Sequence, residues 1–263
     1  MSHAIALWSF RGFVYSSVKR EFQAKYRTSL LGIVWMVLQP LALVSVYILV
    51  FSQIMGARLG GAEGRFAYGI YLCAGLLTWG LFAEVLGRTI NVFVDNANLL
   101  KKLSFPRLCL PLIVLLGSLL NFSIIFGLFV LFLLASGNFP GWVFLGLLPV
   151  LFVQVLFSVG LGVILAVFNV FFRDVGQLFA IVLQFWFWLT PIVYPREVLP
   201  GWVSQWLVLN PMAALIESYQ SVLVHARWPN WVELLPTFLL ALLLCFLGLI
   251  WYRRHAPDMV DEL

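Results

Sequence analysis

The chain has 263 residues, of which 63% are hydrophobic and only 10% are charged. A soluble globular domain is about half apolar and about one quarter charged, so this chain has too little polar surface to be an ordinary soluble enzyme. The same composition excludes an intrinsically disordered chain. The net charge of +5 comes from basic residues that flank apolar runs, which indicates membrane orientation rather than a nucleic-acid partner. We therefore expect one helical domain that crosses a membrane several times.

Six segments are apolar over the roughly 20 residues that a helix needs to cross a bilayer. They are 30–54, 66–93, 108–135, 142–168, 175–194 and 231–252. The turn-forming residues 136–141 separate the third segment from the fourth. The fold class we expect is an all-α membrane protein with six transmembrane helices.

The segment 196–229 is different, because its apolar pieces are too short to cross the membrane. These pieces are 202–209 and 212–224, and Asn210 and Pro211 between them have the residue types of a helix N-cap and a first helical position. We expect a re-entrant helical hairpin that dips into the membrane and returns, between the fifth and sixth helices.

The distribution of basic residues predicts the orientation. With the N-terminus inside, the inner connections hold 11 of the 16 Lys and Arg residues and the outer connections hold 4, while Arg88 lies within a span. Basic residues concentrate on the cytoplasmic side of membrane proteins. Both termini are therefore expected in the cytoplasm, and the re-entrant segment on the outside.

Residues 8–27 have the pattern of a basic amphipathic helix. The apolar residues Phe10, Val14, Val18 and Phe22 repeat every four positions and share one helical face. Such a helix next to a span is expected to lie along the membrane interface. It either anchors the orientation or also binds a lipid-linked anion or a cytoplasmic partner. The residues expected at a lipid diphosphate head group are Lys19, Arg20, Lys25 and Arg27.

The cytoplasmic connection 95–106 has a short helix-like pattern of its own. Leu99, Leu100 and Leu103 can form a small apolar face, and Pro106 ends the pattern. The segment is either a plain loop or a projection that docks into a partner.

Two charged residues lie inside the second apolar segment. Glu84 and Arg88 are four residues apart with the acid first, which is the favourable order for an ion pair on a helix. Charges at membrane depth are rare, and they pair or face a cavity. We interpret the pair as a structural salt bridge, with a gate or pore-lining role as the alternative.

Aromatic residues are concentrated near the outer half of the fifth segment. The residues that we single out there are Phe185, Trp186, Trp188 and Tyr194. Most aromatic residues at such positions belong to the belt at the membrane interface. A subset facing a channel would suit a translocated glycan, because aromatic faces stack on sugar rings.

Motifs for catalysis and nucleotide binding are missing from the sequence. It contains no GxxxxGK[ST], HExxH or GxSxG pattern. We therefore expect a chain that is not an enzyme, with no catalytic, cofactor-binding or metal-ligating residues.

Several short motifs together resemble the permeases of ABC-2-type transporters. They are Lys25–Trp35 with Leu38–Leu41, Asn98–Lys102 with Phe105–Arg107, Phe171–Asp174, Thr190–Pro195 and Asn210–Met212. They cover nearly the whole chain in order, and they resemble most closely the branch that exports O-antigen and teichoic acid.

This resemblance implies a complex and a cargo. Two copies of the chain form the channel, and two copies of a separate ATP-binding cassette subunit, which hold ATP and Mg²⁺, bind beneath them. Residues 8–27 are the interface helix, and the coupling helix involves Asn98, Leu99, Leu100, Lys101, Lys102 and Phe105. The first and fifth helices line the channel, where we add Trp35, Gln39 and Tyr47 to the aromatic residues above. The cargo is a glycan on undecaprenyl diphosphate, exported across the inner membrane of a bacterium.

Two other functions remain open. An ABC-2 exporter of a small hydrophobic drug or lipid would have the same fold. An ATP-independent membrane enzyme or scaffold would lack a nucleotide-binding partner and would leave the 95–106 motif unexplained.

Overall fold

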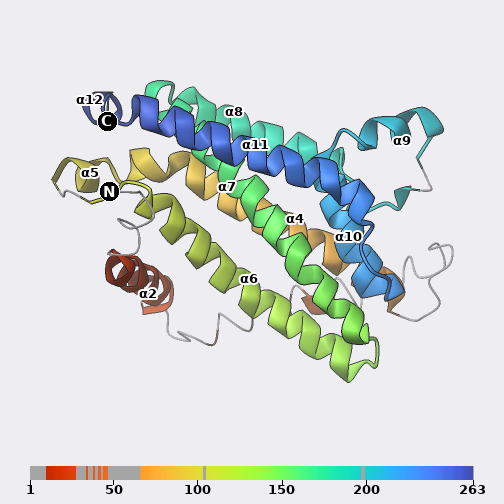
Figure 1. Ribbon diagram of the computed structural model, residues 1–263. Helices are drawn as coiled ribbons and strands as arrows, with labels where there is room; N and C mark the ends of the chain where they lie inside the picture. Colours follow the sequence, from red (N-terminus) through yellow and green to blue (C-terminus); the bar gives the residue numbers. More distant parts are fainter. Residues whose placement is uncertain are drawn as a thin grey trace.

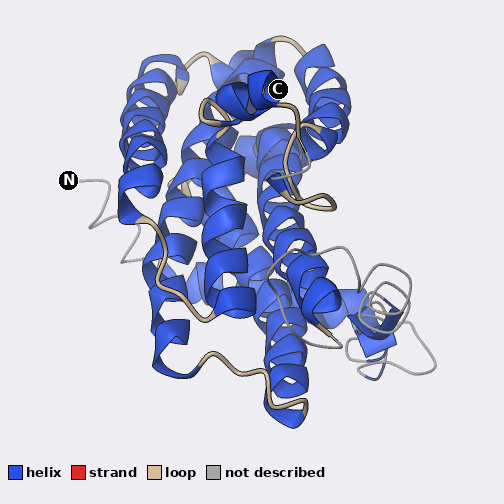
Figure 2. Cartoon of the chain, turned by 90° about the vertical axis from the view of Figure 1, so that its right-hand side faces the viewer, coloured by secondary structure: helices blue, strands red, loops and turns tan. Residues whose placement is uncertain are grey.

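The computed structural model describes residues 10–27, 66–102, 105–196 and 199–262, together with 34, 38, 41–42 and 44–46; the side chains of 25–27, 202–204 and 260–261 are outside this description. Within these residues every regular element is a helix (Figures 1 and 2). The helices are α2 (Arg11–Arg27), α4 (Ala67–Asp95), α5 (Ala97–Lys102), α6 (Cys109–Ala135), the 3-10 helix η1 (Gly141–Gly146), α7 (Leu147–Phe171), α8 (Asp174–Trp188), α9 (Gly201–Leu207), α10 (Pro211–His225), α11 (Trp231–His255) and α12 (Met259–Glu262). The expected first span, 30–54, lies almost entirely outside the described residues.

Four of these helical segments are long and apolar enough to cross a membrane. They are α4, α6, η1 with α7, and α11. Their bounds lie within three residues of the ranges expected for the second, third, fourth and sixth spans. The strong match reflects a simple signal, because each apolar run ends at turn-forming or charged residues.

Helix α8 is shorter than the expected fifth span, 175–194. Its 15 residues extend about 22 Å at 1.5 Å per residue. Pro191 cannot continue the helical hydrogen bonding, so the backbone carbonyls that follow α8 need other donors. Two hydroxyls from α4 supply them: Tyr68 donates to Val193 O at 2.8 Å, and Tyr71 donates to Tyr194 O at 3.1 Å. Contacts from another helix therefore stabilise the non-helical segment after α8.

Helix α4 occupies the centre of the molecule (Figure 1). In its most apolar stretch 78% of the residues are buried within the protein, against 22% in α6 and in α11. Two buried side chains of α7 donate to backbone carbonyls of α4: Gln154 Nε2 to Thr78 O at 2.8 Å, and Asn169 Nδ2 to Ile90 O at 3.1 Å. Such interhelical bonds contribute to stability within a membrane, where an apolar side chain gains little by moving from lipid to the protein interior.

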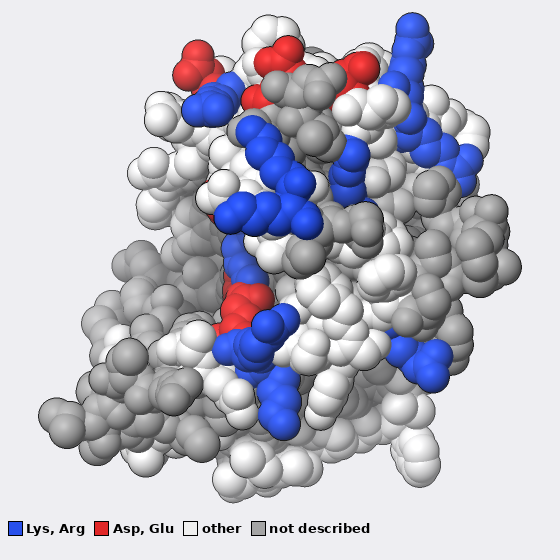
Figure 3. Space-filling model, turned by 90° about the vertical axis from the view of Figure 1, so that its left-hand side faces the viewer, with Lys and Arg blue, Asp and Glu red and all other residues white. Residues whose placement is uncertain are grey.

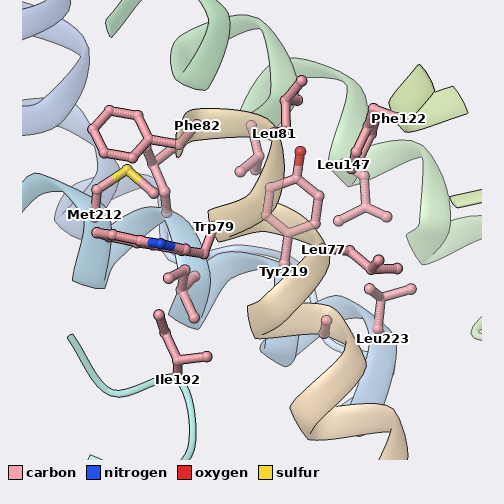
Figure 4. Packing of buried hydrophobic residues seen from close by; sticks show 14 of the residues in the cluster. Leu77, Trp79, Leu81, Phe82, Phe122, Leu147, Ile192, Met212, Tyr219 and Leu223 are labelled. Atoms are coloured by element: carbon pink, nitrogen blue, oxygen red, sulfur yellow. The ribbon is translucent and has the colours of Figure 1, made fainter. Parts of the chain in front are cut away.

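Figure 4 shows part of the buried hydrophobic core, where Trp79 and Phe82 of α4 lie beside Met212 of α10. An aromatic cluster in this core joins α4, α7 and α8. The Phe82 ring lies 5.6 Å from Phe157 in a stacked arrangement and 5.3 Å from Trp186 edge to face. Trp79 lies edge to face against Phe82 at 5.4 Å. These distances are typical of favourable aromatic pairs, so the cluster fixes how the three helices pack.

The two short helices α9 and α10 lie at the opposite end of the molecule from α5 and α12 (Figure 1). The predicted N-cap is confirmed: Asn210 Oδ1 accepts from the backbone N of Met212 at 3.1 Å, and Pro211 occupies the first turn. The same oxygen accepts from Trp186 Nε1 at 2.8 Å, and Asn210 Nδ2 donates to Thr190 Oγ1 at 3.0 Å. Asn210 therefore caps α10 and also joins it to the end of α8.

Candidate functional site

Basic residues gather at the end of the molecule that carries α2, α5, α12 and the end of α11 (Figure 3). The exposed cations on these elements and on the turn before α8 are Arg11, Lys19, Arg20, Lys101, Lys102, Arg173, Arg253 and Arg254. A basic end beside apolar helices attracts anionic lipid head groups. It is also the end that the sequence assigns to the cytoplasm.

An open cavity of about 670 Å³ lies at this end between α2, α4, α5 and α6. Its charged lining consists of Arg20 and Glu21 from α2 with Arg88 and Asp95 from α4. Arg20 is oriented by α2 itself, since its Nε donates to Ser16 O at 3.3 Å. Apolar side chains of α6 complete the wall, so the cavity combines guanidinium groups with a hydrocarbon surface.

The expected pair of Glu84 and Arg88 is present and belongs to a larger polar cluster. Arg88 Nη1 lies 3.5 Å from Glu84 Oε1, and Arg88 Nη2 also pairs with Glu21 of α2. Helix α6 contributes two more partners: Ser118 Oγ accepts from Arg88 at 3.4 Å, and Asn121 Nδ2 donates to Glu84 at 2.9 Å. The cluster therefore connects α2 to two long apolar helices at the rim of the cavity.

Helix α2 uses its apolar face to pack against α6. Val14 is buried in a small cluster with Cys109 and Ile113, and Phe10, Phe13 and Val18 pack around it. The rings of Phe13 and Phe105 are 5.2 Å apart. Part of the face that the sequence assigns to the membrane interface is thus covered by protein.

The short helix α5 has one buried and one exposed side. Leu100 is 8% exposed and packs in a cluster with residues of α4, α6, α7 and α12, and Leu99 is half-buried beside it. Asn98, Lys101 and Lys102 are exposed. The leucines therefore attach α5 to the protein, and the polar residues form its outer surface.

The aromatic candidates are dispersed. Phe185 and Trp188 are 67% and 61% exposed on α8, whereas Trp186 lies in the aromatic core. The Tyr194 hydroxyl donates to Trp188 O at 2.6 Å. Trp35, Gln39 and Tyr47, and the side chains of Lys25 and Arg27, lie outside the described residues.

Sequence reasoning missed Glu21, Ser118 and Asn121. Glu21 follows Val14 by seven positions and Val18 by three, so it is an acid on the apolar face of an otherwise basic helix. That placement is the signal that could have identified it as a partner for Arg88.

Comparison with known proteins gives one family and several relatives. A family described as ABC-2 type transporter matches residues 13–224. The O-antigen export system permease protein RfbA of Myxococcus xanthus is 33% identical over 226 residues, which is 85% of each chain. RfbA of Klebsiella pneumoniae is 27% identical over 89% of this chain and 88% of its own length. The polysialic acid transport protein KpsM of Escherichia coli is 22% identical over 92% of this chain and 93% of its own length.

Proposed function

Because the chain belongs to the ABC-2 type transporter family, we propose that it exports an O-antigen-like polysaccharide carried on undecaprenyl diphosphate, moving it from the cytoplasmic side outward. It is a multi-pass membrane permease subunit, and transporters of this kind hydrolyse ATP on a separate ATPase. The observation that carries the proposal is the similarity to O-antigen export permeases over most of both chains. We place the protein in a bacterial inner membrane with both termini in the cytoplasm.

The proposed architecture is a single transmembrane domain over residues 1–263. It has an interface helix at 8–27, six spans, a coupling segment at 95–106 and an external re-entrant segment at 196–229. The basic end with α2 and α5 supports this topology, because basic residues concentrate on the cytoplasmic side. The shorter α8 contributes the fifth span together with the residues that follow it.

The outer surface of α5 is the proposed contact with the ATPase. Asn98, Lys101 and Lys102 would meet the partner, while Leu99 and Leu100, with Phe105 nearby, attach the segment to the long helices. ATP and Mg²⁺ are held by the two partner subunits. ATP shifts the transporter between two conformations only if it binds one of them more tightly than the other. In this proposal, α5 transmits the resulting conformational change of the ATPase to α4.

The cavity at the basic end is the proposed site for the diphosphate head group of the carrier. Arg20 lines it, and Lys19, Lys25 and Arg27 belong to the same helix. A guanidinium group binds phosphate oxygens in a bidentate manner, and the apolar wall suits the start of a lipid chain.

A second copy of the chain completes the channel in this proposal. Phe185 and Trp188 of α8 are exposed on this copy. We propose that they face the channel together with Trp35, Gln39 and Tyr47. The ring of Trp186 supports this surface from the core side. Aromatic faces bind sugar rings without requiring one particular sugar sequence, so a glycan can move along them.

The test is co-purification followed by an ATPase assay. The tagged protein is purified in mild detergent from its host, and its partners are identified by mass spectrometry. We expect a stoichiometric ATP-binding subunit whose ATPase activity, in proteoliposomes, rises with the host's undecaprenyl-diphosphate-linked glycan. Stimulation by hydrophobic drugs instead would favour a drug or lipid exporter, and absence of an ATPase would favour an enzyme or scaffold.

The head-group site has its own test. Arg27→Ala is expected to lower glycan export without unfolding the protein, because the change removes one cation from the proposed head-group site. Wild-type export by this variant would refute the role of Arg27.

A further inference from the structure

Two short helices contact each other at the basic end of the molecule. Helix α5 has six residues and α12 has four, and α12 packs against both α5 and α7. The two helices lie at the same end in Figure 1, although they are far apart in the sequence. An isolated helix shorter than about 12 residues is marginal in water, so both depend on contacts with the rest of the protein.

Met259 supplies the apolar contact of α12. Its side chain is 0% exposed and belongs to the buried cluster that contains Leu100 of α5. The same cluster includes Val167 of α7 and Tyr252 of α11. The flexible methionine side chain is suited to fill an irregular space between helices. Met259 therefore attaches α12 to the cluster that also anchors α5.

A polar contact fixes the turn that precedes α12. Arg107 lies between α5 and α6, and its guanidinium group donates to the backbone O of Ala256. Ala256 is the C-cap of α11. The last carbonyls of a helix have no acceptor-satisfying partner within the helix, so a basic side chain is favourable there. The segment after α5 and the segment before α12 are therefore joined directly.

These contacts connect α5 to more than one long helix. Only Asn96 separates α5 from the end of α4, so α4 and α5 are linked through the chain itself. Helix α12 adds a second connection, because it contacts α5 on one side and α7 on the other. Helix α7 packs in turn against α4 and α11. A displacement of α5 can therefore reach α7 through α12.

We propose that α12 holds α5 in the orientation that the ATPase meets, with Met259 as a positioning residue. This inference rests on the proposed function, because it takes the exposed side of α5 as the ATPase contact. Met259 is buried and does not meet the ATPase itself. Without its side chain, α5 keeps the exposed Lys101 and Lys102 and still binds the partner. It loses its fixed position relative to α7, so the conformational change of the ATPase reaches the long helices incompletely.

Amide hydrogen exchange of the purified chain in detergent measures how firmly α5 is held. We expect Met259→Ala to accelerate exchange of the α5 amides about threefold or more, because local opening becomes easier. Met259→Leu nearly conserves the side-chain volume and should exchange like the wild type. Met212→Ala is the matched control, because Met212 is also 0% exposed but lies in α10, at the opposite end. It should leave the exchange of α5 unchanged.

A second variant removes the polar contact and leaves the apolar cluster intact. Arg107→Gln is expected to accelerate exchange of the α5 amides about twofold, since the bond to Ala256 is lost. Arg254→Gln, which replaces an exposed cation at the same end, should have no effect on α5. Equal exchange in Arg107→Gln and Arg254→Gln would contradict the role of the Arg107 contact.

The functional measurement uses the permease with its co-purified ATPase and the host's lipid-linked glycan. Met259→Ala should retain the ATPase but lose at least half of the glycan-stimulated activity, and Met259→Leu should restore it. Unchanged α5 exchange in Met259→Ala, or equal acceleration by Met212→Ala, would overturn the proposal. So would full glycan stimulation of Met259→Ala, or loss of its ATPase on purification. The exchange measurement needs neither ATPase nor glycan, so failure of this proposal and failure of the exporter assignment can be distinguished.

Discussion

Replacement of Asn210 by Ala tests how helix α10 is attached to the end of α8. The side chain caps α10 through Met212 N at 3.1 Å, accepts from Trp186 Nε1 at 2.8 Å and donates to Thr190 Oγ1 at 3.0 Å. Asn230 is a matched control, because it caps α11 in the same way, through Val232 N at 3.2 Å. Among the described residues, its side chain receives no hydrogen bond from another helix.

The expected magnitudes follow from these contacts. Loss of an N-cap Asn is destabilising by about 1 kcal/mol, which is the value expected for Asn230→Ala. Asn210→Ala also leaves the partly buried Trp186 indole N–H without its acceptor, which adds about 1–2 kcal/mol. The expected loss of unfolding free energy is therefore about 2–3 kcal/mol for Asn210→Ala.

Denaturation of the purified variants in mixed detergent measures this difference, with helix content followed by circular dichroism. Trp186→Phe removes the same indole bond, so a double-mutant cycle with Asn210→Ala should give a coupling of about 1 kcal/mol. Equal destabilisation by Asn210→Ala and Asn230→Ala, or zero coupling, would refute the argument that Asn210 joins α10 to α8.

Three further predictions concern the helix packing and the basic end. Gly160→Ala should destabilise the protein by about 1–3 kcal/mol, because the added Cβ would lie 2.7 Å from a backbone N of α11. Gly127→Ala is the control, because its added Cβ would have nothing within 4 Å, and equal unfolding midpoints of the two variants would contradict the argument. In a double-mutant cycle, Arg88→Gln and Glu21→Gln should show a coupling of about 0.5–1 kcal/mol in the free energy of unfolding. The coupling is small because both side chains are partly exposed. Destabilisations that simply add in the double variant would count against the ion pair. Lys101→Glu should leave the unfolding midpoint unchanged and reduce the amount of ATPase that co-purifies; undiminished co-purification would argue against α5 as the docking surface.

The long helices could be predicted because their signal lies along the chain. The apolar run 66–93 anticipates α4 (Ala67–Asp95) almost to the residue, since only a long and mostly apolar stretch is needed. The end of α8 could not be located in this way. The non-helical segment that follows it is stabilised by Tyr68 and Tyr71, which are more than 100 residues away in the sequence.

In the candidate site, too, the local features could be predicted from the sequence and the long-range contacts could not. The pair of Glu84 and Arg88 is local, at a spacing of four residues, so the sequence predicts it. Glu21 is 67 residues from Arg88, and the fold of α2 against α6 is needed to bring the two together. The aromatic run near the end of α8 is equally ambiguous in sequence, because only the packing separates the partly buried Trp186 from the exposed Trp188.

The position of the lipid-linked glycan in cells depleted of this protein tests the central claim most directly. Spheroplasts are treated with periodate from the outside, and the undecaprenyl-linked glycan that survives is quantified. An exporter of this glycan predicts that depletion makes the glycan accumulate in a protected pool facing the cytoplasm. Glycan that still reaches the outer face at the wild-type rate would contradict the proposed function.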